Sequence, residues 1–308
     1  MFNAQCLMFN NFYQLPPLLT PGDKVIAIAP SGALKDTDAL EAGLNVWRSR
    51  GYRVELGLHC NSSYGYLAGT DLDRRNALQA AWDDPECKAI VCIRGGYGGA
   101  RLLENWQWNL AQNAPKWIIG FSDVTALLWS LATVKIAALH APVITTVAQE
   151  PAWSKERMFN YLETGKLPSL QGTSWQSGIA SGLLLPANLT VATHLLHTPL
   201  QPSFDGVILA LEDVTEYPYR IDRLLTQWRL SGAFTGVKGI ALGRFSRCEP
   251  YPGTNSLTIE QVLRDRLMDL NIPIVADLPF GHDGVNAALP VGHRATLNGD
   301  RGELTIEH

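Results

Sequence analysis

One stretch in the first half of the chain decides the fold: Lys116-Trp117-Ile118-Ile119-Gly120-Phe121-Ser122-Asp123-Val124-Thr125-Ala126-Leu127-Leu128. It is typical of a buried strand, a tight turn that carries a serine, and an apolar helix. A serine on such a turn projects from the sheet edge beside backbone N–H groups, which suits a nucleophile. Serine is also a favoured helix N-cap. Ser122 is therefore a candidate nucleophile or a cap.

The same alternation of strand, turn and helix runs through the first half of the chain. Apolar runs rich in Val, Ile and Ala end in Gly or Pro turns and precede helix-like stretches, which predicts parallel βαβ units. We expect strands at 24–29, 52–56, 89–93, 117–119 and 136–139, and helices at 36–50, 71–83, 99–110 and 123–132. The predicted fold class is α/β, with an N-terminal parallel-sheet domain of flavodoxin-like or Rossmann-like layers.

The second half has a different pattern. Residues 150–182 are rich in Trp, Ser, Gly, Thr and Pro and show little periodicity, which is typical of a linker. After them we expect strands at 182–185, 207–211, 239–242, 274–276 and 294–297, with helices only near 219–230 and 256–270. We predict an N-terminal domain over 1–165, a linker over 166–182, and a strand-rich α/β C-terminal domain over 183–308.

Composition limits the partners. The 308 residues are 46% hydrophobic and 18% charged, as in soluble globular proteins. A net charge of −4 without a dense Lys/Arg cluster disfavours nucleic acid and membrane surfaces. The first twenty residues contain no Lys or Arg, and no apolar run is long enough to span a bilayer, so neither a secretory signal nor a membrane span is expected. Five cysteines without a Cys-x-x-Cys pair predict reduced thiols in a cytoplasmic protein.

A glycine-rich turn, Arg94-Gly95-Gly96-Tyr97-Gly98-Gly99, follows the strand at 89–93. Its bare backbone can approach a phosphate or an oxyanion closely. A dinucleotide-binding fingerprint would need a glycine at Arg101 and an acidic residue near Lys116, and a P-loop would need Gly-Lys-Ser/Thr, so both are absent. Gly96 therefore either belongs to a simple connection or donates one hydrogen bond to an oxyanion.

A serine nucleophile needs a base, and His282 is the best placed of seven histidines. It lies in a loop that follows the strand at 274–276, and functional side chains gather on loops held by rigid strands. His194 and His197 have a spacing that could serve a metal, but no third ligand is near, so we expect packed or surface side chains. His59, His140 and His293 have no supporting pattern.

A carboxylate follows the apolar run at 207–211. Glu212 lies where a core strand would emerge, and a charge there is costly unless it is paired, for instance by orienting an imidazole. The alternative is a solvated strand end. Asp213 and Glu216 are expected at the surface or near the N-terminus of the following helix.

Taken together, these motifs resemble the LD-carboxypeptidase family of serine peptidases, which also includes microcin-immunity-type peptidases. The resemblance rests on Gly120-Phe121-Ser122-Asp123, on Gly281-His282 and on Asn286. Further matching blocks lie at 21–24, 29–31, 66–71, 94–98, 211–214, 219–227 and 289–292, in the family's order. They cover residues 20–300.

The resemblance implies a Ser-Glu-His triad: Ser122 as nucleophile, His282 as general base and then acid, and Glu212 as the group that orients the imidazole. It also implies an oxyanion hole made by the backbone N–H groups of Gly96 and Asp123, and a site in the cleft between the domains. The implied substrate is a cytoplasmic murein tetrapeptide that loses its terminal D-alanine. No metal or organic cofactor is implied, and the family commonly forms homodimers.

Two other functions are weighed against this one. An amidase of the microcin-immunity type would act on a peptidyl or aminoacyl nucleotide and would need an aromatic side chain to stack on the base, for which Trp153 and Trp175 are candidates. A protein that only binds an anionic peptide would not need a base and its orienting acid. One departure from the family is Pro186-Ala187, which replaces two glycines before Asn188 and stiffens the backbone there.

Overall fold

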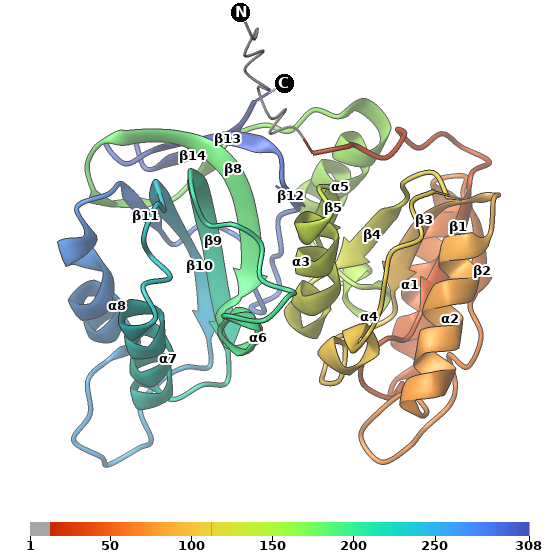
Figure 1. The fold of residues 1–308 in the computed structure, drawn as a ribbon, viewed down its shortest axis with the longest axis horizontal. Helices are drawn as coiled ribbons and strands as arrows, with labels where there is room; N and C mark the ends of the chain where they lie inside the picture. The colour runs from red at the N-terminus through yellow and green to blue at the C-terminus, as the bar shows by residue number, and fades with distance from the viewer. Residues whose placement is uncertain (1–12, 112, 308) are drawn as a thin grey trace, which may run out of the picture.

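The chain forms two α/β halves, each built on its own sheet (Figure 1). A computed structural model describes residues 13–111 and 113–307. The elements of the first half are β1 (Lys24–Ile28), α1 (Thr37–Ser49), β2 (Arg53–Leu56), α2 (Asp71–Asp83), β3 (Cys87–Cys92), η1 (Ala100–Leu103), β4 (Trp117–Gly120), η2 (Ser122–Val124), α3 (Thr125–Thr133), β5 (Ala138–His140), α4 (Ile144–Val147) and α5 (Ala152–Thr164).

The first sheet has the strand order β12-β5-β4-β3-β1-β2. Strands β1 to β5 are parallel and follow the flavodoxin-like order 2-1-3-4-5, which confirms the predicted fold class. In such sheets ligands bind at the carboxyl ends of the strands, where the strand order reverses. That point lies between β1 and β3, where Gly32 N donates to Gly95 O at 3.2 Å.

The second half begins with strands and ends with strands. Its elements are β6 (Leu170–Gln171), β7 (Thr173–Gln176), β8 (Ile179–Asn188), α6 (Leu189–Leu195), β9 (Val207–Val214), α7 (Pro218–Leu230), β10 (Gly239–Ser246), α8 (Ile259–Leu267), η3 (Met268–Leu270), β11 (Ile274–Ala276), β12 (Leu289–Val291), β13 (Arg294–Asn298) and β14 (Glu303–Ile306). All except β12 and the helices join one mixed sheet, in which β8, β9, β10 and β11 are parallel neighbours.

Strand β12 ties the two halves together. It follows the second-half strand β11 in sequence but pairs antiparallel with β5 at the edge of the first sheet, with Leu289 opposite His140. The chain then returns to the second sheet as β13, beside β8. In Figure 1 β12 and β5 lie at the centre of the molecule, between the two halves.

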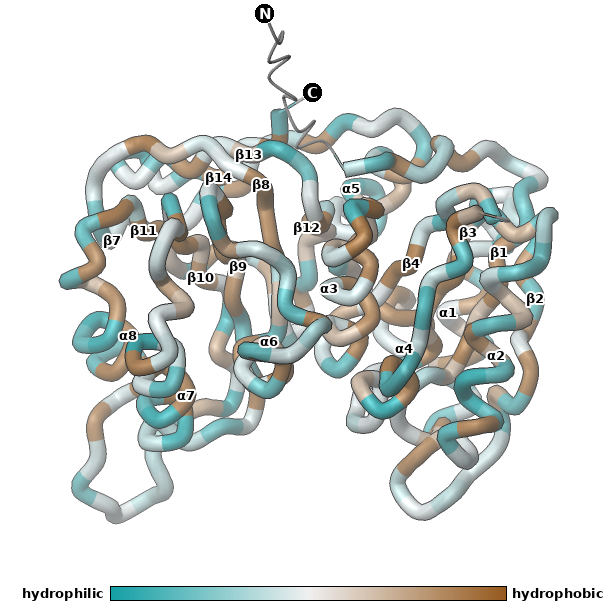
Figure 2. The backbone as a smooth tube through the Cα atoms, viewed as in Figure 1, coloured by the Kyte–Doolittle hydropathy of each residue, from teal (hydrophilic) through white to brown (hydrophobic). Residues whose placement is uncertain are grey.

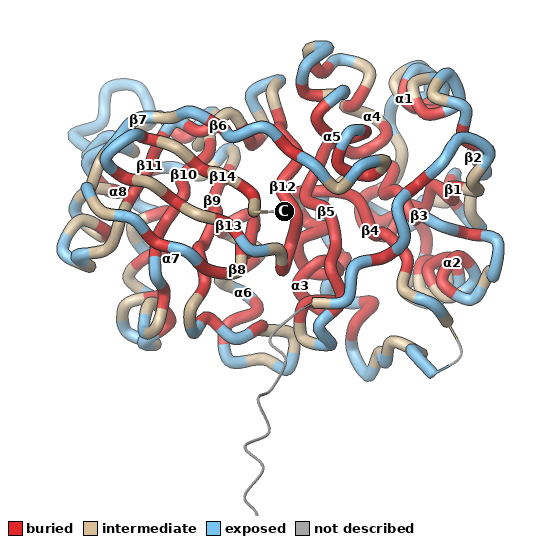
Figure 3. The backbone as a smooth tube through the Cα atoms, turned by 90° about the horizontal axis from the view of Figure 1, so that it is seen from above, coloured by how far each residue is buried: buried red, intermediate tan, exposed pale blue. Residues whose placement is uncertain are grey.

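The packing of both halves follows from their apolar strands. β3 and β4 lie inside the first sheet and are continuous apolar runs, as expected of parallel strands covered on both faces. Helix α2 begins at Thr70, which forms a capping box with Asp73. In Figure 2 hydrophobic residues follow the strands, and in Figure 3 the buried residues run through both sheets while exposed ones lie on outer loops and helices.

Several sequence-based expectations need correction. The helix expected at 99–110 is wrong: only the short 3-10 turn η1 forms there, because Asn105 adopts a left-handed φ of 59°. The expectation of a linker with little regular structure over 150–182 is also wrong, since it contains α5, β6, β7 and the start of β8. Helix α6 was not expected either. The proposed domain boundaries themselves stay a prediction.

Helices in the described ranges are too short or too polar to cross a bilayer.

Candidate active site

Ser122 lies two residues after the end of β4, in a left-handed backbone conformation with φ 63°. This conformation costs an L-residue about 1–2 kcal/mol, and such strain is found at functional sites. The serine does not act as a helix cap, because neither the start of η2 nor the start of α3 has a side-chain capping hydrogen bond. The cap alternative is therefore wrong.

Gly95 lets the glycine loop approach Ser122. A Cβ placed on Gly95 would lie 2.9 Å from Ser122 Cβ and 3.1 Å from its Oγ, closer than real side chains allow. The Gly95 carbonyl accepts from Gly32 N, and in a trans peptide the next N–H points to the opposite side. The N–H of Gly96 therefore points away from Gly32. Gly96 itself is exposed and has a φ of 122°.

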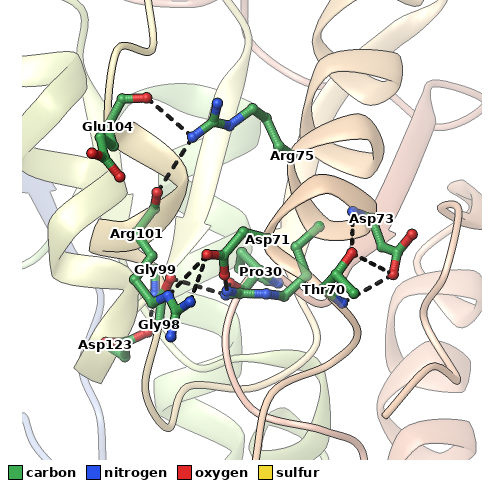
Figure 4. Close-up of polar contacts among 11 residues, drawn as sticks. Pro30, Thr70, Asp71, Asp73, Arg75, Gly98, Gly99, Arg101, Glu104 and Asp123 are labelled. Carbon is green, nitrogen blue, oxygen red and sulfur yellow. Dashed lines mark hydrogen bonds and ion pairs between the residues drawn. The ribbon is translucent and has the colours of Figure 1, made fainter. Parts of the chain in front are cut away.

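The far end of the glycine loop is braced by polar contacts (Figure 4). Asp123 Oδ2 accepts from Gly99 N at 2.7 Å. Arg74 Nη1 donates to Gly98 O at 2.9 Å and also to Pro30 O. Burial raises the pKa of the Asp123 carboxyl, and the hydrogen bonds that it accepts oppose this shift. The side chain of Asp123 is thus used to hold the loop next to the serine.

Arginine side chains make further contacts around Asp71 and Glu104. Asp71, at the start of α2, contacts Arg74 Nη2 through Oδ1 at 2.5 Å and Arg101 Nη2 through Oδ2 at 2.7 Å. Arg75 Nη2 donates to the carbonyl of Glu104 at 3.0 Å. Figure 4 shows these contacts between the first turns of α2 and the segment that follows the glycine loop. They attach the glycine loop and the segment after it to helix α2.

Glu212 and His282 form a buried pair in the second half. Glu212 ends the apolar part of β9 and is fully buried, so the solvated strand end is wrong. Its Oε2 lies 2.7 Å from His282 Nδ1, and its Oε1 accepts from Asn188 Nδ2 at 3.3 Å. A carboxylate on Nδ1 leaves Nε2 as the ring nitrogen available to a substrate or nucleophile.

The nucleophile candidate and the base candidate line one cavity of about 310 Å³. Its walls include Ser122, Arg94, Gly95 and Gly96 from the first half and His282 from the second. The ring of Phe121 packs on the His282 imidazole, with centroids 4.6 Å apart. In the described part of the chain, no hydrogen bond joins Ser122 Oγ to the His282 imidazole. The cavity therefore brings the two groups to one space.

The loop that carries His282 is held by the first half. Asn286 Oδ1 accepts from Gly281 N at 3.2 Å, and Asn286 N donates to Glu150 Oε2 at 2.9 Å. Ser154 on α5 donates to the same Glu150 oxygen at 2.8 Å. Burial raises the pKa of Glu150. This chain of contacts was not found from the sequence, where Glu150 was only the start of an irregular stretch.

Asp213 is not a surface acid, and that expectation is wrong. It is buried, and burial together with the neighbouring Glu212 charge raises its pKa to about 6. It accepts from Asn188 Nδ2 at 3.1 Å and from Thr190 N and Oγ1 at 2.9 and 2.7 Å. The sequence signal was Asn188-Leu189-Thr190, in which Asn188 is the N-cap of α6. Glu216, by contrast, pairs with Arg220 on α7 at 3.4 Å.

His140, His194 and His197 differ in burial. His140 is fully buried at the end of β5, between the rings of Phe121 and Phe280, and burial lowers its pKa to about 4. It therefore stays neutral near pH 7. His194 and His197 are exposed. Within residues 13–111 and 113–307, no three His, Cys, Asp or Glu side chains gather where they could hold a metal ion.

Comparisons with known proteins identify the family of this chain. The model of the LD-carboxypeptidase N-terminal domain matches residues 25–141, and that of the C-terminal domain matches residues 181–297. A Synechocystis protein named as a carboxypeptidase is 57% identical over 96% of this chain and 98% of its own. The murein tetrapeptide carboxypeptidase of Pseudomonas aeruginosa is 33% identical over 90% of this chain and 94% of its own.

Solved structures extend the comparison. Muramoyltetrapeptide carboxypeptidase from Oxalobacter formigenes is 28% identical, with a TM-score of 0.81 over 92% of this chain and 97% of its own. The microcin C7 self-immunity protein MccF, in a complex with aspartyl sulfamoyl adenosine, is 19% identical, with a TM-score of 0.83 over 96% of this chain and 98% of its own. The latter likeness concerns the fold alone. With both domain models matched, the chain belongs to the LD-carboxypeptidase family and is a serine-type carboxypeptidase, a hydrolase.

Proposed function

We propose that this protein hydrolyses the LD-peptide bond before the terminal D-alanine of murein tetrapeptides, as a step of peptidoglycan recycling. One observation carries the proposal: the buried pair of Glu212 and His282 opens, through the imidazole, onto the cavity that Ser122 also lines. The names of the relatives from Pseudomonas and Oxalobacter support this choice of substrate.

In the acylation step, Ser122 Oγ attacks the carbonyl that precedes D-alanine, and His282 Nε2 takes the hydroxyl proton. The resulting imidazolium is stabilised by Glu212, whose Oε2 is 2.7 Å from Nδ1. The tetrahedral intermediate collapses, the C–N bond breaks, and the proton on Nε2 passes to the leaving nitrogen. D-Alanine departs as a free amino acid, and the tripeptide remains as an ester of Ser122.

Deacylation repeats these steps with water. His282 takes a proton from a water molecule, which attacks the ester carbonyl, and returns that proton to Ser122 Oγ as the tripeptide acid leaves. The negative oxygen in both steps is assigned to the backbone N–H groups of Gly96 and Asp123. The exposed position of Gly96 N–H and the place of Asp123 directly after the nucleophile support this assignment.

An exopeptidase must also hold the terminal carboxylate of its substrate. Two cations, Lys35 and Arg94, line the cavity that contains Ser122. Arg94 donates Nη1 to Ala33 O at 2.7 Å and Nε to Gly95 O at 3.2 Å, which fixes the guanidinium beside the glycine loop. We assign the D-alanine carboxylate to these two residues, because cations there would select peptides that end one residue after the scissile bond.

The second candidate function is an amidase of the microcin-immunity type, which would act on peptidyl or aminoacyl nucleotides. It is favoured by Trp175, which lines a larger cavity that His282 also borders, where an aromatic ring could stack on a base. One face of this ring is already covered, because the Arg264 guanidinium lies 4.1 Å from its centroid. Trp153 lies on α5 and lines neither cavity.

The test is mass spectrometry of L-Ala-γ-D-Glu-meso-diaminopimelate-D-Ala incubated with the wild-type protein and with Ser122→Ala. We expect the wild type alone to remove one D-alanine, with the variant slower by about 10³-fold or more. An intact tetrapeptide with well-folded wild type would contradict the proposal. Cleavage of an aminoacyl-adenylate analogue by the same sample would then establish the amidase.

Two further properties belong to this proposal. A cytoplasmic location is supported by the four buried, unpaired cysteines of the described ranges, since free thiols persist where the environment is reducing. A homodimer is supported by the resemblance to the family, and light scattering of the purified protein would test it. The partner is a small peptide or muropeptide, without metal or organic cofactor.

A further inference from the structure

A second cavity, of about 570 Å³, is also bordered by His282, the proposed base. His282 lines both cavities, so the space that contains Ser122 and this larger space adjoin the same residue. The larger cavity belongs to the second half, at the carboxyl ends of β10 and β11 and against α8. A peptide whose scissile carbonyl meets Ser122 can therefore extend past His282 into it.

Three charged side chains gather beside the base in this cavity. Arg244 lies on β10, Asp277 directly follows β11, and Asp283 directly follows His282. The backbone of Arg244 packs on Gly281, where an added Cβ would meet Arg244 O at 3.0 Å, and Arg244 N donates to Phe280 O at 2.8 Å. These contacts fix the arginine next to the loop that carries the base.

The Arg244, Asp277 and Asp283 side chains can bind a ligand that carries both a positive and a negative charge. Arg244 Nη1 lies 3.7 Å from Asp277 Oδ1, and its Nε lies 3.5 Å from Asp283 Oδ2. Both distances exceed the usual 2.7–3.2 Å of N–H···O hydrogen bonds, so the guanidinium donors stay available. The Arg244 side chain is 40% exposed, and those of Asp277 and Asp283 are 56% and 40% exposed. Arg264, the nearby cation on α8, is already engaged by Glu260 at 2.8 Å.

The division of the substrate between the cavities follows from size and charge. The leaving residue is a single small amino acid, and it fits the smaller cavity with Lys35 and Arg94. The acyl part is larger and needs the larger space. An L-lysine side chain at the third position would bring only an ammonium toward Arg244. A diaminodicarboxylic acid brings an ammonium and a carboxylate on one carbon, which matches an arginine flanked by two aspartates.

We propose that Arg244, Asp277 and Asp283 bind the zwitterionic end of a diaminodicarboxylic acid side chain at the third position of the peptide. Arg244 takes the distal carboxylate, and the two aspartates take the distal ammonium. This inference rests on the proposed function, because it assumes that the residue before the scissile bond is acylated onto Ser122. It makes the cavity the specificity site for the third residue.

The test compares tetrapeptides that differ in one group of the third residue: meso-diaminopimelate with a free distal carboxyl, the same residue with that carboxyl amidated, and L-lysine. Release of D-alanine gives kcat and KM for each. For the wild type, kcat/KM should be at least about tenfold lower for the amidated peptide and for the lysine peptide, because the carboxylate partner of Arg244 is missing.

The variant Arg244→Gln should lower kcat/KM at least about tenfold more for the free acid than for the amidated peptide. The amidated peptide already lacks the carboxylate that Arg244 would bind, so it loses less when the guanidinium is removed. Arg301→Gln is the matched control, since Arg301 is an exposed arginine that lines neither cavity and pairs with Glu303 at 3.6 Å. It should keep the wild-type preference among the peptides.

The outcomes separate the two proposals. If well-folded wild type cleaves none of the three peptides, the proposed function is wrong and the specificity site falls with it. If the wild type cleaves the free acid and the amidated peptide equally well, or if Arg244→Gln lowers both equally, the specificity site alone is wrong. Should Arg244→Gln fail to fold by circular dichroism, the wild-type comparison of acid and amide still decides.

Discussion

Ser122 adopts a left-handed backbone conformation, and Gly95 packs closely against its side chain. Its φ of 63° turns the side chain out of the β4 direction, and Gly95 lies against it so closely that no side chain fits there. The sequence singles out Ser122, Glu212 and His282 as candidates, because each lies within or after an apolar strand and carries reactive chemistry, and the structure places Ser122 and His282 on one cavity. The sequence could not identify Gly95, because that requirement arises from a contact between two loops 27 positions apart (122 minus 95).

Gly95→Ala tests this contact. The new Cβ would lie 2.9 Å from Ser122 Cβ, so the nucleophile must move. We expect kcat/KM to fall by about 100-fold, the effect of a displacement near 1 Å at a reacting group, while the free energy of unfolding falls by only about 1–2 kcal/mol. Peptide hydrolysis and urea unfolding measure the two effects.

A suitable control for this variant is Gly65→Ala. Gly65 has a φ of 60° and no atom near an added Cβ, so the substitution strains the backbone without touching the site. It should lower stability and leave kcat/KM within about twofold, as for a change distant from the site. If Gly95→Ala keeps the wild-type kcat/KM, the close contact between Gly95 and Ser122 is not needed for activity.

At the scale of elements, the sequence predicted most of what local patterns decide. The parallel strands of the first sheet and helices α1, α2 and α7 follow from apolar periodicity and capping residues, and they are confirmed. The helix expected at 99–110 does not form, because the chain turns at Asn105, which has a φ of 59°, and Trp106 and Trp108 then pack edge to face with centroids 5.3 Å apart. Helix α6 was missed because it has only seven residues and begins where a stiffened turn was expected.

The junction between β9 and α6 makes stability depend on pH. Burial raises the pKa of Asp213 to about 6, above its ordinary value of 3.8. The folded protein therefore binds this proton more tightly than the unfolded chain does, and its stability falls as pH rises from about 4 to 6. Asp213→Asn removes this titration. The variant should gain about 2 kcal/mol relative to the wild type between pH 4 and pH 7, whatever its offset at pH 4.

Urea unfolding of both proteins across this pH range gives the comparison. Taking the difference between them removes the contribution of groups that do not contact Asp213. The variant retains an amide oxygen that can accept from Thr190 N and Oγ1, so helix α6 keeps its contact with β9. A difference in unfolding free energy that does not change with pH would mean that Asp213 titrates normally in the folded protein.

For the whole molecule, the proposed catalysis requires that the two halves are joined in one arrangement. Ser122 belongs to the first sheet, whereas Glu212 and His282 belong to the second half. The segment from Gly281 to β12 leaves the second half, contacts Glu150 through Asn286, and then pairs with β5. The sequence could not indicate this route, because β12 is only three residues long and its partner β5 lies about 150 positions earlier (289 minus 140).

Glu150→Ala should therefore weaken both stability and catalysis. It leaves Asn286 N and the Ser154 hydroxyl without their acceptor in a buried site, at a cost of about 1–3 kcal/mol in unfolding free energy. Because Asn286 also accepts from Gly281 N, the loop that carries His282 loses part of its support. We expect kcat to fall by about tenfold or more, with a smaller change in KM, since the base is displaced and the substrate cations remain.

Two companion variants separate this effect from a general loss of charge on this part of the chain. Glu156→Ala removes an exposed carboxylate of α5 that pairs with Arg50, and should change stability by less than about 0.5 kcal/mol without affecting kcat. Glu150→Gln keeps one acceptor oxygen for Asn286 N and should recover most of the activity. If Glu150→Ala is as active as Glu156→Ala, the link through Glu150 is not needed to position the proposed base, and the β12–β5 pairing is sufficient.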